Sequence, residues 1–193
     1  IRGDTTDVQL GRLVTAEIYD SSGNVLSYNT LTRPNSWTLR NEDLGSLDDG
    51  TLYLIARTSD RAGNSAYAPL FSIELDTQAE ITISSAATAT MDNVINSSEQ
   101  TSAPLGGDSA GIESGQVLDI QLTDATGLML AGTATVGAGG DWSASLDITS
   151  LADGDIDFIV SGEDVAGNPA GDSYVFHKDA TAQITAQFND PDD

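Results

Sequence analysis

The feature that most constrains the fold of this chain is an internal repeat with a period of about one hundred residues. When the numbering is shifted by 104, residues 60–64 align with 164–168, and residues 47–50 align with 151–154. This period is longer than the roughly 20–50 residues of a solenoid unit, and it suits a chain of domains that each bury a core. The sequence therefore predicts tandem copies of one small domain.

The pattern of apolar residues in the second copy predicts strands. Alternation of apolar and polar residues marks strands over 80–83, 116–123, 128–136, 142–148, 155–162 and 173–177. No segment has a convincing helical period. About seven short strands, with turns every 8–12 residues or so, predict an all-β fold of β-sandwich domains. Trp37 and Trp142, which align in the repeat, are expected in the cores.

The register of the repeat divides the chain into three segments. Residues 1–76 are expected to form a domain that lacks its first strand, 77–179 a complete domain, and 180–193 the first strand of a following copy. The last expectation rests on the similarity of 183–186 to 80–83. Two explanations remain open: the chain is a piece of a longer array, or its last strand completes the first domain of another molecule.

Composition limits the classes of partner. With 30 acidic and 7 basic residues, the chain has a formal charge of -23 and would repel nucleic acids and anionic membrane surfaces. No apolar run reaches the length of a membrane span, and the absence of cysteine excludes disulfides and thiolate metal sites. The charge has three interpretations: solubility, adaptation to high salt, or oxygen ligands for Ca²⁺. The third is favoured because much of the aspartate stands beside Gly or Asn in predicted turns.

Several motifs of the second copy, taken together, resemble one family of bacterial domains. They are DNVIN at 92–96, GIESG at 111–115, GDW at 140–142, LADG at 151–154, DVAGNP at 164–169 and KDATA at 178–182. In combination they are similar to the bacterial immunoglobulin-like tandem repeats of large secreted adhesins of the RTX and biofilm-associated type. The resemblance covers the whole chain, although residues 41–45 expand one loop of the first copy.

The resemblance implies a function. It implies a secreted or cell-surface protein in which these domains are extender or spacer repeats, with neighbouring repeats of the same protein as partners. Two alternatives remain: a filament or matrix subunit that assembles head-to-tail by donor-strand addition, and a carbohydrate- or ice-binding module. Four threonines, Thr88, Thr90, Thr133 and Thr135, are too few to favour a flat ice- or sugar-binding face.

In such arrays the resemblance also implies Ca²⁺ at the domain junctions, where it stiffens the chain. Carboxylates that gather without Lys or Arg repel one another unless a cation neutralises them, and Ca²⁺ accepts about 6–8 oxygen ligands. The predicted ligands are Asp20, Asp48, Asp49, Asp76, Asp108, Glu113, Asp164, Asn168 and Asp179. The competing interpretation is that Asp-x-x-Gly-Asn is an ordinary turn, in which Asp caps backbone amides and Gly supplies a positive φ.

No motif predicts catalysis, and the chain is not expected to be an enzyme. His177 is the only histidine and is expected on the surface of a closing strand, which gives no basis for a Ser-His-Asp triad or a zinc site. The acid spacing at Asp153, Asp155 and Asp157 resembles the start of an EF-hand loop. Its sixth position is Phe158 rather than Gly, so Asp155 and Asp157 are expected to be outward-facing strand residues.

Overall fold

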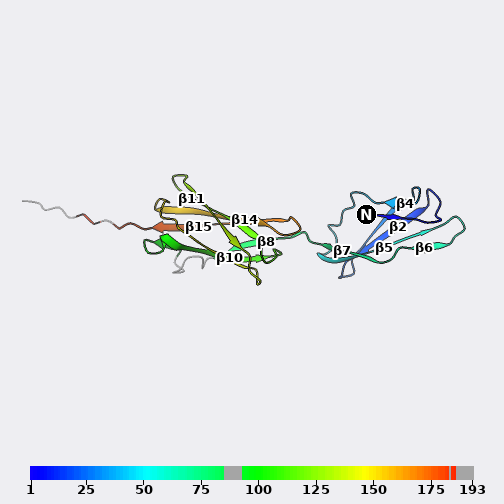
Figure 1. Cartoon of the computed structure of the whole chain (residues 1–193), viewed down its shortest axis with the longest axis horizontal. Helices are drawn as coiled ribbons and strands as arrows, with labels where there is room; N and C mark the ends of the chain where they lie inside the picture. Colours follow the sequence, from blue (N-terminus) through cyan, green and yellow to red (C-terminus); the bar gives the residue numbers. More distant parts are fainter. Residues whose placement is uncertain (85–92, 183, 186–193) are drawn as a thin grey trace, which may run out of the picture. The chain divides into compact units, whose positions relative to one another are not determined.

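The computed structural model describes residues 1–84, 93–182 and 184–185 (Figure 1). The chain divides into two units, Ile1–Thr77 (unit 1) and Gln78–Asp193 (unit 2). The division lies one residue from the boundary expected from the repeat. Apart from one 3₁₀ turn at Gln100–Ser102, the regular structure of the described residues is β-strand, so the all-β prediction is confirmed.

Unit 1 consists of two facing antiparallel sheets. Its strands are β1 (Arg2–Asp4), β2 (Leu13–Tyr19), β3 (Val25–Leu31), β4 (Ser36–Thr38), β5 (Gly50–Ser59), β6 (Ser65–Tyr67) and β7 (Phe71–Leu75). The larger sheet has the order β3-β2-β5, and both β6 and β7 pair with the free edge of β5. The smaller sheet is the pair β1-β4.

Unit 2 follows the same plan with more strands. They are β8 (Glu80–Ile83), β9 (Val94–Asn96), β10 (Ala103–Ala110), β11 (Val117–Asp124), β12 (Met129–Thr135), β13 (Asp141–Leu146), β14 (Gly154–Glu163) and β15 (Pro169–Asp179). One sheet has the order β13-β10-β8, and the other has the order β12-β11-β14-β15-β9. The pairing of β9 with β15 is parallel, and the other pairings among the described residues of this unit are antiparallel.

The strand register reproduces the sequence repeat. Gly3 stands opposite Trp37 in the β1–β4 pair, and Gly107 stands opposite Trp142 in the β10–β13 pair. Both tryptophans are buried, as predicted, with exposed fractions of 5% and 2%. Strands β1 and β4 of unit 1 therefore correspond to β10 and β13 of unit 2.

The cores of the two units differ. In unit 2 the buried apolar residues form a single cluster, which includes Ile81 and Ile83 of β8 together with Phe158 and Phe176 of the facing sheet. In unit 1 they form two separate clusters, one around Trp37 and one around Leu52.

Candidate functional site

The predicted ligands do not meet in one compact cluster. Among the residues that the structure describes, no group of three or more His, Cys, Asp or Glu side chains is placed to hold a metal ion. Most of the predicted ligands instead accept hydrogen bonds that hold turns together. Three of these arrangements occur in both units.

The first repeated arrangement is a buried aspartate that joins two loops. Asp20, which is 6% exposed, follows β2 directly. Its carboxylate accepts hydrogen bonds from the backbone N–H of Asn24 at 2.8 Å and from the Asn24 side-chain amide at 2.6 Å. It also accepts the backbone N–H of Asp48 at 2.9 Å, across 28 residues of chain. This last bond is the largest cause of the lowered pKa of Asp20.

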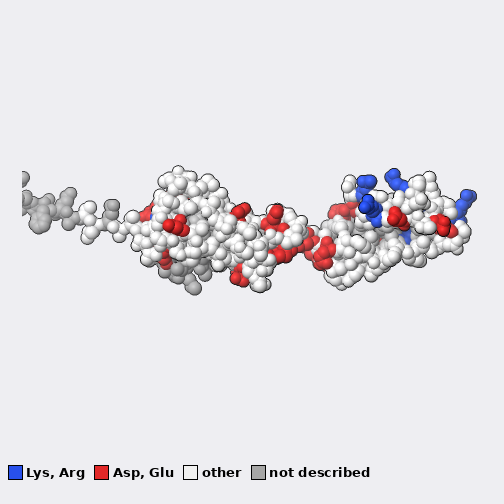
Figure 2. All heavy atoms as spheres, in the orientation of Figure 1, with Lys and Arg blue, Asp and Glu red and all other residues white. Residues whose placement is uncertain are grey.

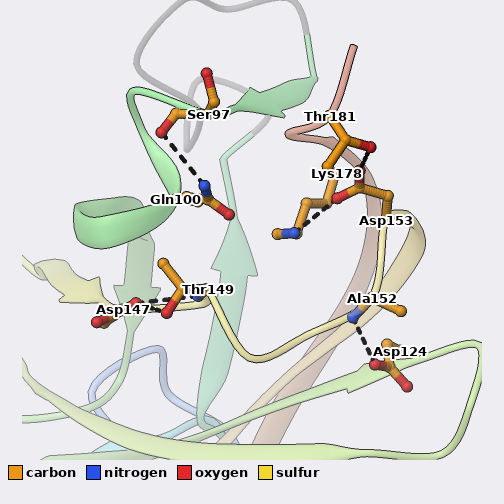
Figure 3. Close-up of polar contacts among 9 residues, drawn as sticks. All are labelled: Ser97, Gln100, Asp124, Asp147, Thr149, Ala152, Asp153, Lys178 and Thr181. Carbon is orange, nitrogen blue, oxygen red and sulfur yellow. Dashed lines mark hydrogen bonds and ion pairs between the residues drawn. The ribbon is translucent and has the colours of Figure 1, made fainter. Parts of the chain in front are cut away.

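Asp124 occupies the equivalent place in unit 2. Its carboxylate accepts the backbone N–H groups of Thr126, Leu128 and Ala152, the last at 2.8 Å (Figure 3). The bond from Ala152 is the largest cause that lowers the pKa of Asp124 to about 2. An aspartate at this repeat position therefore fastens two loops to one another. One is the turn after β2 or β11, and the other is the loop that leads into β5 or β14.

The second repeated arrangement is the Asp-x-x-Gly-Asn turn. In both copies the aspartate accepts the backbone N–H and the side-chain amide of the asparagine, at 2.8 and 2.7 Å for Asp60 and Asn64 and at the same distances for Asp164 and Asn168. Burial acts to raise the pKa of Asp164, but hydrogen bonds from Asn168, Gly167 and Ala166 together outweigh it, and the net shift of the pKa is downward. The glycine of each turn has a positive φ, 96° at Gly63 and 92° in the second copy. These are the bonds of an ordinary capped turn.

The third repeated arrangement fixes the second residue after the last strand of each unit. In unit 1 the Asp49 carboxylate accepts the backbone N–H of Thr77 at 3.2 Å and its hydroxyl at 2.8 Å. In unit 2 Asp153 accepts the Thr181 hydroxyl at 2.7 Å and pairs with the Lys178 ammonium at 2.7 Å (Figure 3). The Lys178 side chain is only 4% exposed, and its bond lowers the pKa of Asp153 to about 2.

The remaining predicted ligands lie at separate places. Glu113 accepts the backbone N–H of Val165 at 2.9 Å and so links its loop to the 164–168 turn. Asp108 lies within β10, Asp179 is the last residue of β15, and Asp76 follows β7 directly.

Other sequence predictions are placed as follows. His177 is exposed on β15 and pairs with Asp155 of β14 at 2.9 Å, and both Asp155 and Asp157 face solvent as expected. Thr133 and Thr135 are exposed on β12, whereas Thr88 and Thr90 lie outside the described residues. Among the described residues, no helix has the length and apolar character needed to cross a membrane.

Sequence reasoning missed two features of these arrangements, namely Asp124 and the pair Lys178–Asp153. Each left a signal. Asp124 aligns with Asp20 in the repeat, and Lys178 is the only lysine of the chain. Two residues from Phe176 on the same strand, Lys178 belongs to the face that the alternation predicts to be buried.

Solved structures of adhesins are similar to this chain. A tetra-tandem repeat in the extending region of a large adhesion protein is 32% identical, with 94% of this chain and 45% of that chain covered and a TM-score of 0.48. A 1.5-MDa bacterial ice-binding adhesin, studied for its retention at the host cell surface, is 21% identical over 94% of this chain and 57% of that chain, with a TM-score of 0.48. A Ca²⁺-stabilised adhesin of an Antarctic bacterium is 28% identical over 94% and 44%, with a TM-score of 0.45. All three are adhesion proteins.

These are proteins of the class that the sequence motifs resemble. The chain spans about half the length of each of them. No family model matches the chain, and no curated protein matches it.

Proposed function

We propose that this chain belongs to the extender of a secreted bacterial adhesin displayed at the cell surface, in which its units act as spacers and Ca²⁺ acts as a structural ion. The observation that carries the proposal is the kind of residue that the two units share. Asp20 and Asp124 fasten loops, and Asp49 and Asp153 hold the second residue after the last strand. The two copies thus share the residues that fasten the loops of a unit and the residues that fix the chain where it leaves the unit. A spacer needs both.

The proposal assigns neighbouring repeats of the same protein as the partners of each unit. Asp49 holds Thr77, the last residue of unit 1, and a Cβ on Gly111 would meet the carbonyl of Gln78, the first residue of unit 2. Both ends of the connection are therefore fixed to their own unit. A connection with so few free residues favours tandem units over units on a long flexible tether.

The donor set in the turns beside this connection suits Ca²⁺. In unit 1 the consecutive carboxylates Asp48 and Asp49 lie there, and in unit 2 Glu113 is joined through Val165 to the turn that begins at Asp164. An ionised carboxylate offers about four lone-pair sites, so one that accepts one or two hydrogen bonds still has sites for a hard cation. Asp48, Asp49 and Asp76 would supply the ligands of unit 1, and Glu113 and Asp164 those of unit 2. An ion bound in either unit would neutralise the repulsion among the carboxylates of that unit.

A calcium titration tests the proposal. We expect Ca²⁺ to raise the melting temperature of the whole chain, by an amount that corresponds to about 2.7 kcal/mol when the ion is at 100 times its Kd. We also expect small-angle X-ray scattering to show a narrower distribution of distances with Ca²⁺. Mg²⁺ at equal ionic strength is the control for charge screening, because it prefers a more regular octahedral geometry.

Matched variants identify the carboxylates. Asp48→Asn combined with Glu113→Gln removes two charges from the turns beside the connection and should weaken the calcium effect. Asp119→Asn combined with Asp141→Asn removes two exposed charges of β11 and β13 and should leave it unchanged. Equal melting temperatures and scattering curves with Ca²⁺ and with EDTA would disprove the role of calcium.

A further inference from the structure

Unit 1 carries two tyrosines side by side on the outer face of its larger sheet. Tyr19 of β2 and Tyr53 of β5 are cross-strand partners, and the buried residues of both strands are the even-numbered ones. Tyr53 is 40% exposed and Tyr19 is partly exposed. The Cβ atoms of cross-strand partners are about 5 Å apart, so the two rings are neighbours. We call this surface the tyrosine face, and it comprises Tyr19, Tyr53, Glu17, Ile55, Thr15, Arg57 and Asn29.

Polar side chains continue the tyrosine face along the strands. The Tyr19 hydroxyl donates to one carboxylate oxygen of Glu17 at 2.9 Å, and the Arg57 guanidinium pairs with the other oxygen at 3.5 Å. In the next row the Thr15 hydroxyl donates to the Asn29 side-chain oxygen at 2.9 Å. These bonds orient the polar groups beside the rings. The Arg57 side chain is 54% exposed and has five N–H donors, so it keeps donors for a ligand.

Unit 2 has different residues at the equivalent positions of the same strands. The equivalents of Tyr19, Tyr53, Glu17 and Arg57 are Thr123, Asp157, Gln121 and Ser161, in that order. The sheet therefore forms without aromatic residues at these positions. Since the fold does not require the exposed tyrosines, they indicate a function that is particular to unit 1.

The exposure of the tyrosine face does not depend on the first strand of a unit. In unit 2 the strand β8 pairs with β10 of the other sheet and inserts Ile81 and Ile83 into the core. With β8 in place, the outer positions of the larger sheet are still exposed, among them Asp119, Asp157 and Ile159. A strand of this kind covers the core side of a unit and leaves the outer face open.

The tyrosine face is close to electrically neutral, although the whole chain has a formal charge of -23. Its one carboxylate, Glu17, is paired with Arg57, and all six arginines of the chain lie in unit 1, as the view in Figure 2 illustrates. The equivalent face of unit 2 exposes Asp119, Asp155 and Asp157. A neutral ligand suits this balance of charge, whereas an anionic polymer would be repelled by the rest of the chain.

The size of the tyrosine face selects between classes of partner. The strands β3, β2 and β5 together span about 10 Å, and the stretch from Thr15 to Tyr19 is about 13 Å long. The resulting area of about 130 Å² is far below the roughly 800 Å² that each partner buries in a stable protein interface. A chain of sugar rings needs less area. It offers C–H faces that pack on aromatic rings, and hydroxyls that bond to carboxylate, amide and guanidinium groups.

We propose that the tyrosine face binds a neutral polysaccharide. Tyr19 and Tyr53 stack on the sugar rings, because the negative face of an aromatic ring attracts C–H groups. Glu17, Arg57 and Asn29 bond to the hydroxyls at the ring edges. This site adds an adhesive surface to a unit that otherwise acts as a spacer, and it does not involve the exposed threonines of β12.

Affinity electrophoresis of the whole chain tests the proposal. The gels contain dextran, laminarin or hydroxyethyl cellulose as the neutral polymer, or alginate as the acidic one, and EDTA in every gel separates sugar binding from the role of calcium. We expect a neutral polymer to retard the chain. Tyr53→Ala should raise the Kd about tenfold because it removes one stacking ring, whereas Tyr53→Phe keeps the ring and should retain binding. Asp157→Ala, at the equivalent position of unit 2, is the matched control and should leave the Kd unchanged.

The indole NMR signal of Trp37 verifies that unit 1 stays folded in each variant. Migration that none of the neutral polymers slows would overturn the proposal, as would equal retardation of the chain and of Tyr53→Ala. Retardation by alginate alone would overturn it too, since the ligand would then be recognised by charge. Sedimentation velocity examines a protein partner: self-association that Tyr53→Ala abolishes would make the tyrosine face a contact between copies and would refute the assignment to carbohydrate.

Discussion

Units 1 and 2 share a strand plan but differ in how completely their cores are closed. In unit 2 the strand β8 lies between β10 and β15, and the buried apolar residues form one cluster. In unit 1 the equivalent place is an open apolar groove whose lining includes Trp37, Phe71 and Ile73, and the buried residues form two clusters. The difference corresponds to β8, which supplies Ile81 and Ile83 to the single cluster of unit 2.

The units also differ in charge. Residues 1–77 contain all six arginines and 11 acidic residues, whereas residues 78–193 contain one lysine and 19 acidic residues. The one lysine is buried against Asp153 and leaves little positive charge on the surface of unit 2. The strong negative charge of the chain is therefore mainly a property of unit 2.

The largest expected effect comes from truncating the matched core residues Phe176 and Ile73. Phe176→Ala should lower the free energy of unfolding of unit 2 by about 3–5 kcal/mol, because it leaves a cavity in a closed core. Ile73→Ala should cost unit 1 much less, about 1 kcal/mol, because its side chain already borders open space. Urea unfolding followed by NMR measures both, since the indole signals of Trp37 and Trp142 report one unit each. Equal losses in the two units would contradict the contrast between open and closed cores.

A second matched pair tests whether β8 itself makes the difference. A Cβ on Gly107 would meet the backbone carbonyl of Thr82 in β8, whereas a Cβ on Gly3 would meet only the ring of Trp37, at 2.6 Å. The backbone of a paired strand, such as Thr82, can move less readily than a side chain beside a groove, such as Trp37. Gly107→Ala should therefore cost unit 2 about 1–3 kcal/mol, and Gly3→Ala should cost unit 1 less.

Hydrogen exchange gives the readout for this pair. Gly107→Ala should speed exchange of the β8 amides more than those of β12. A substitution that leaves the protection of β8 unchanged would show that the strand does not depend on close contact at Gly107.

The third contrast concerns Lys178 and its structural equivalent, Leu75. Gly154 stands opposite Lys178 as Gly50 stands opposite Leu75, so one unit uses an ion pair where the other uses an apolar side chain. The pKa of Asp153 is lowered to about 2, below its usual 3.8. The bond to Lys178 therefore stabilises unit 2 above about pH 4, and this contribution is lost as the pH falls through the folded-state pKa.

Lys178→Met should shift the pKa of Asp153 back toward its usual value and lower the melting temperature of unit 2 by several degrees at pH 7. It should also make the stability of unit 2 fall less steeply between pH 4 and pH 2, by roughly one proton. Leu75→Met in unit 1 is the control and should change neither quantity appreciably. The experiment is a series of thermal melts from pH 2 to pH 7, and an unchanged acid slope would show that Lys178 is not the partner that lowers this pKa.

Much of this fold can be predicted from the sequence, because apolar and polar residues alternate along any strand that has one buried face. The strands predicted over 80–83, 155–162 and 142–148 correspond to β8, β14 and β13 within one or two residues at most ends. Strands β9 and β10 were not predicted. β10 contains Gly106 and Gly107, which provide no alternating side chains, and β9 is only three residues long. Both strands can be identified only from the strands with which they pair.

The turn bonds were harder to predict than the strands. The sequence identifies Asp20 and Asp164 as special, but a carboxylate that binds a cation and one that caps backbone amides have the same signature beside Gly and Asn. The distances show the caps, since Asn24 and Asn168 each donate to both oxygens of their aspartates, but each of these oxygens keeps a further lone pair. The groove was predictable only from the register of the two copies, because it follows from a difference between them.

The smallest expected effect concerns an exposed cross-strand pair that occupies the same place in both units. Asp155 faces His177 at 2.9 Å in unit 2, and Thr51 donates to Glu74 at 3.1 Å in unit 1. The His177 side chain is 49% exposed, so solvent screens the interaction and both partners lose side-chain freedom when they meet. His177→Gln and Glu74→Gln should therefore each change the free energy of unfolding at pH 7 by less than about 0.5 kcal/mol. A loss above 1 kcal/mol in only one unit would show that solvent does not screen the pair of that unit as its exposure implies.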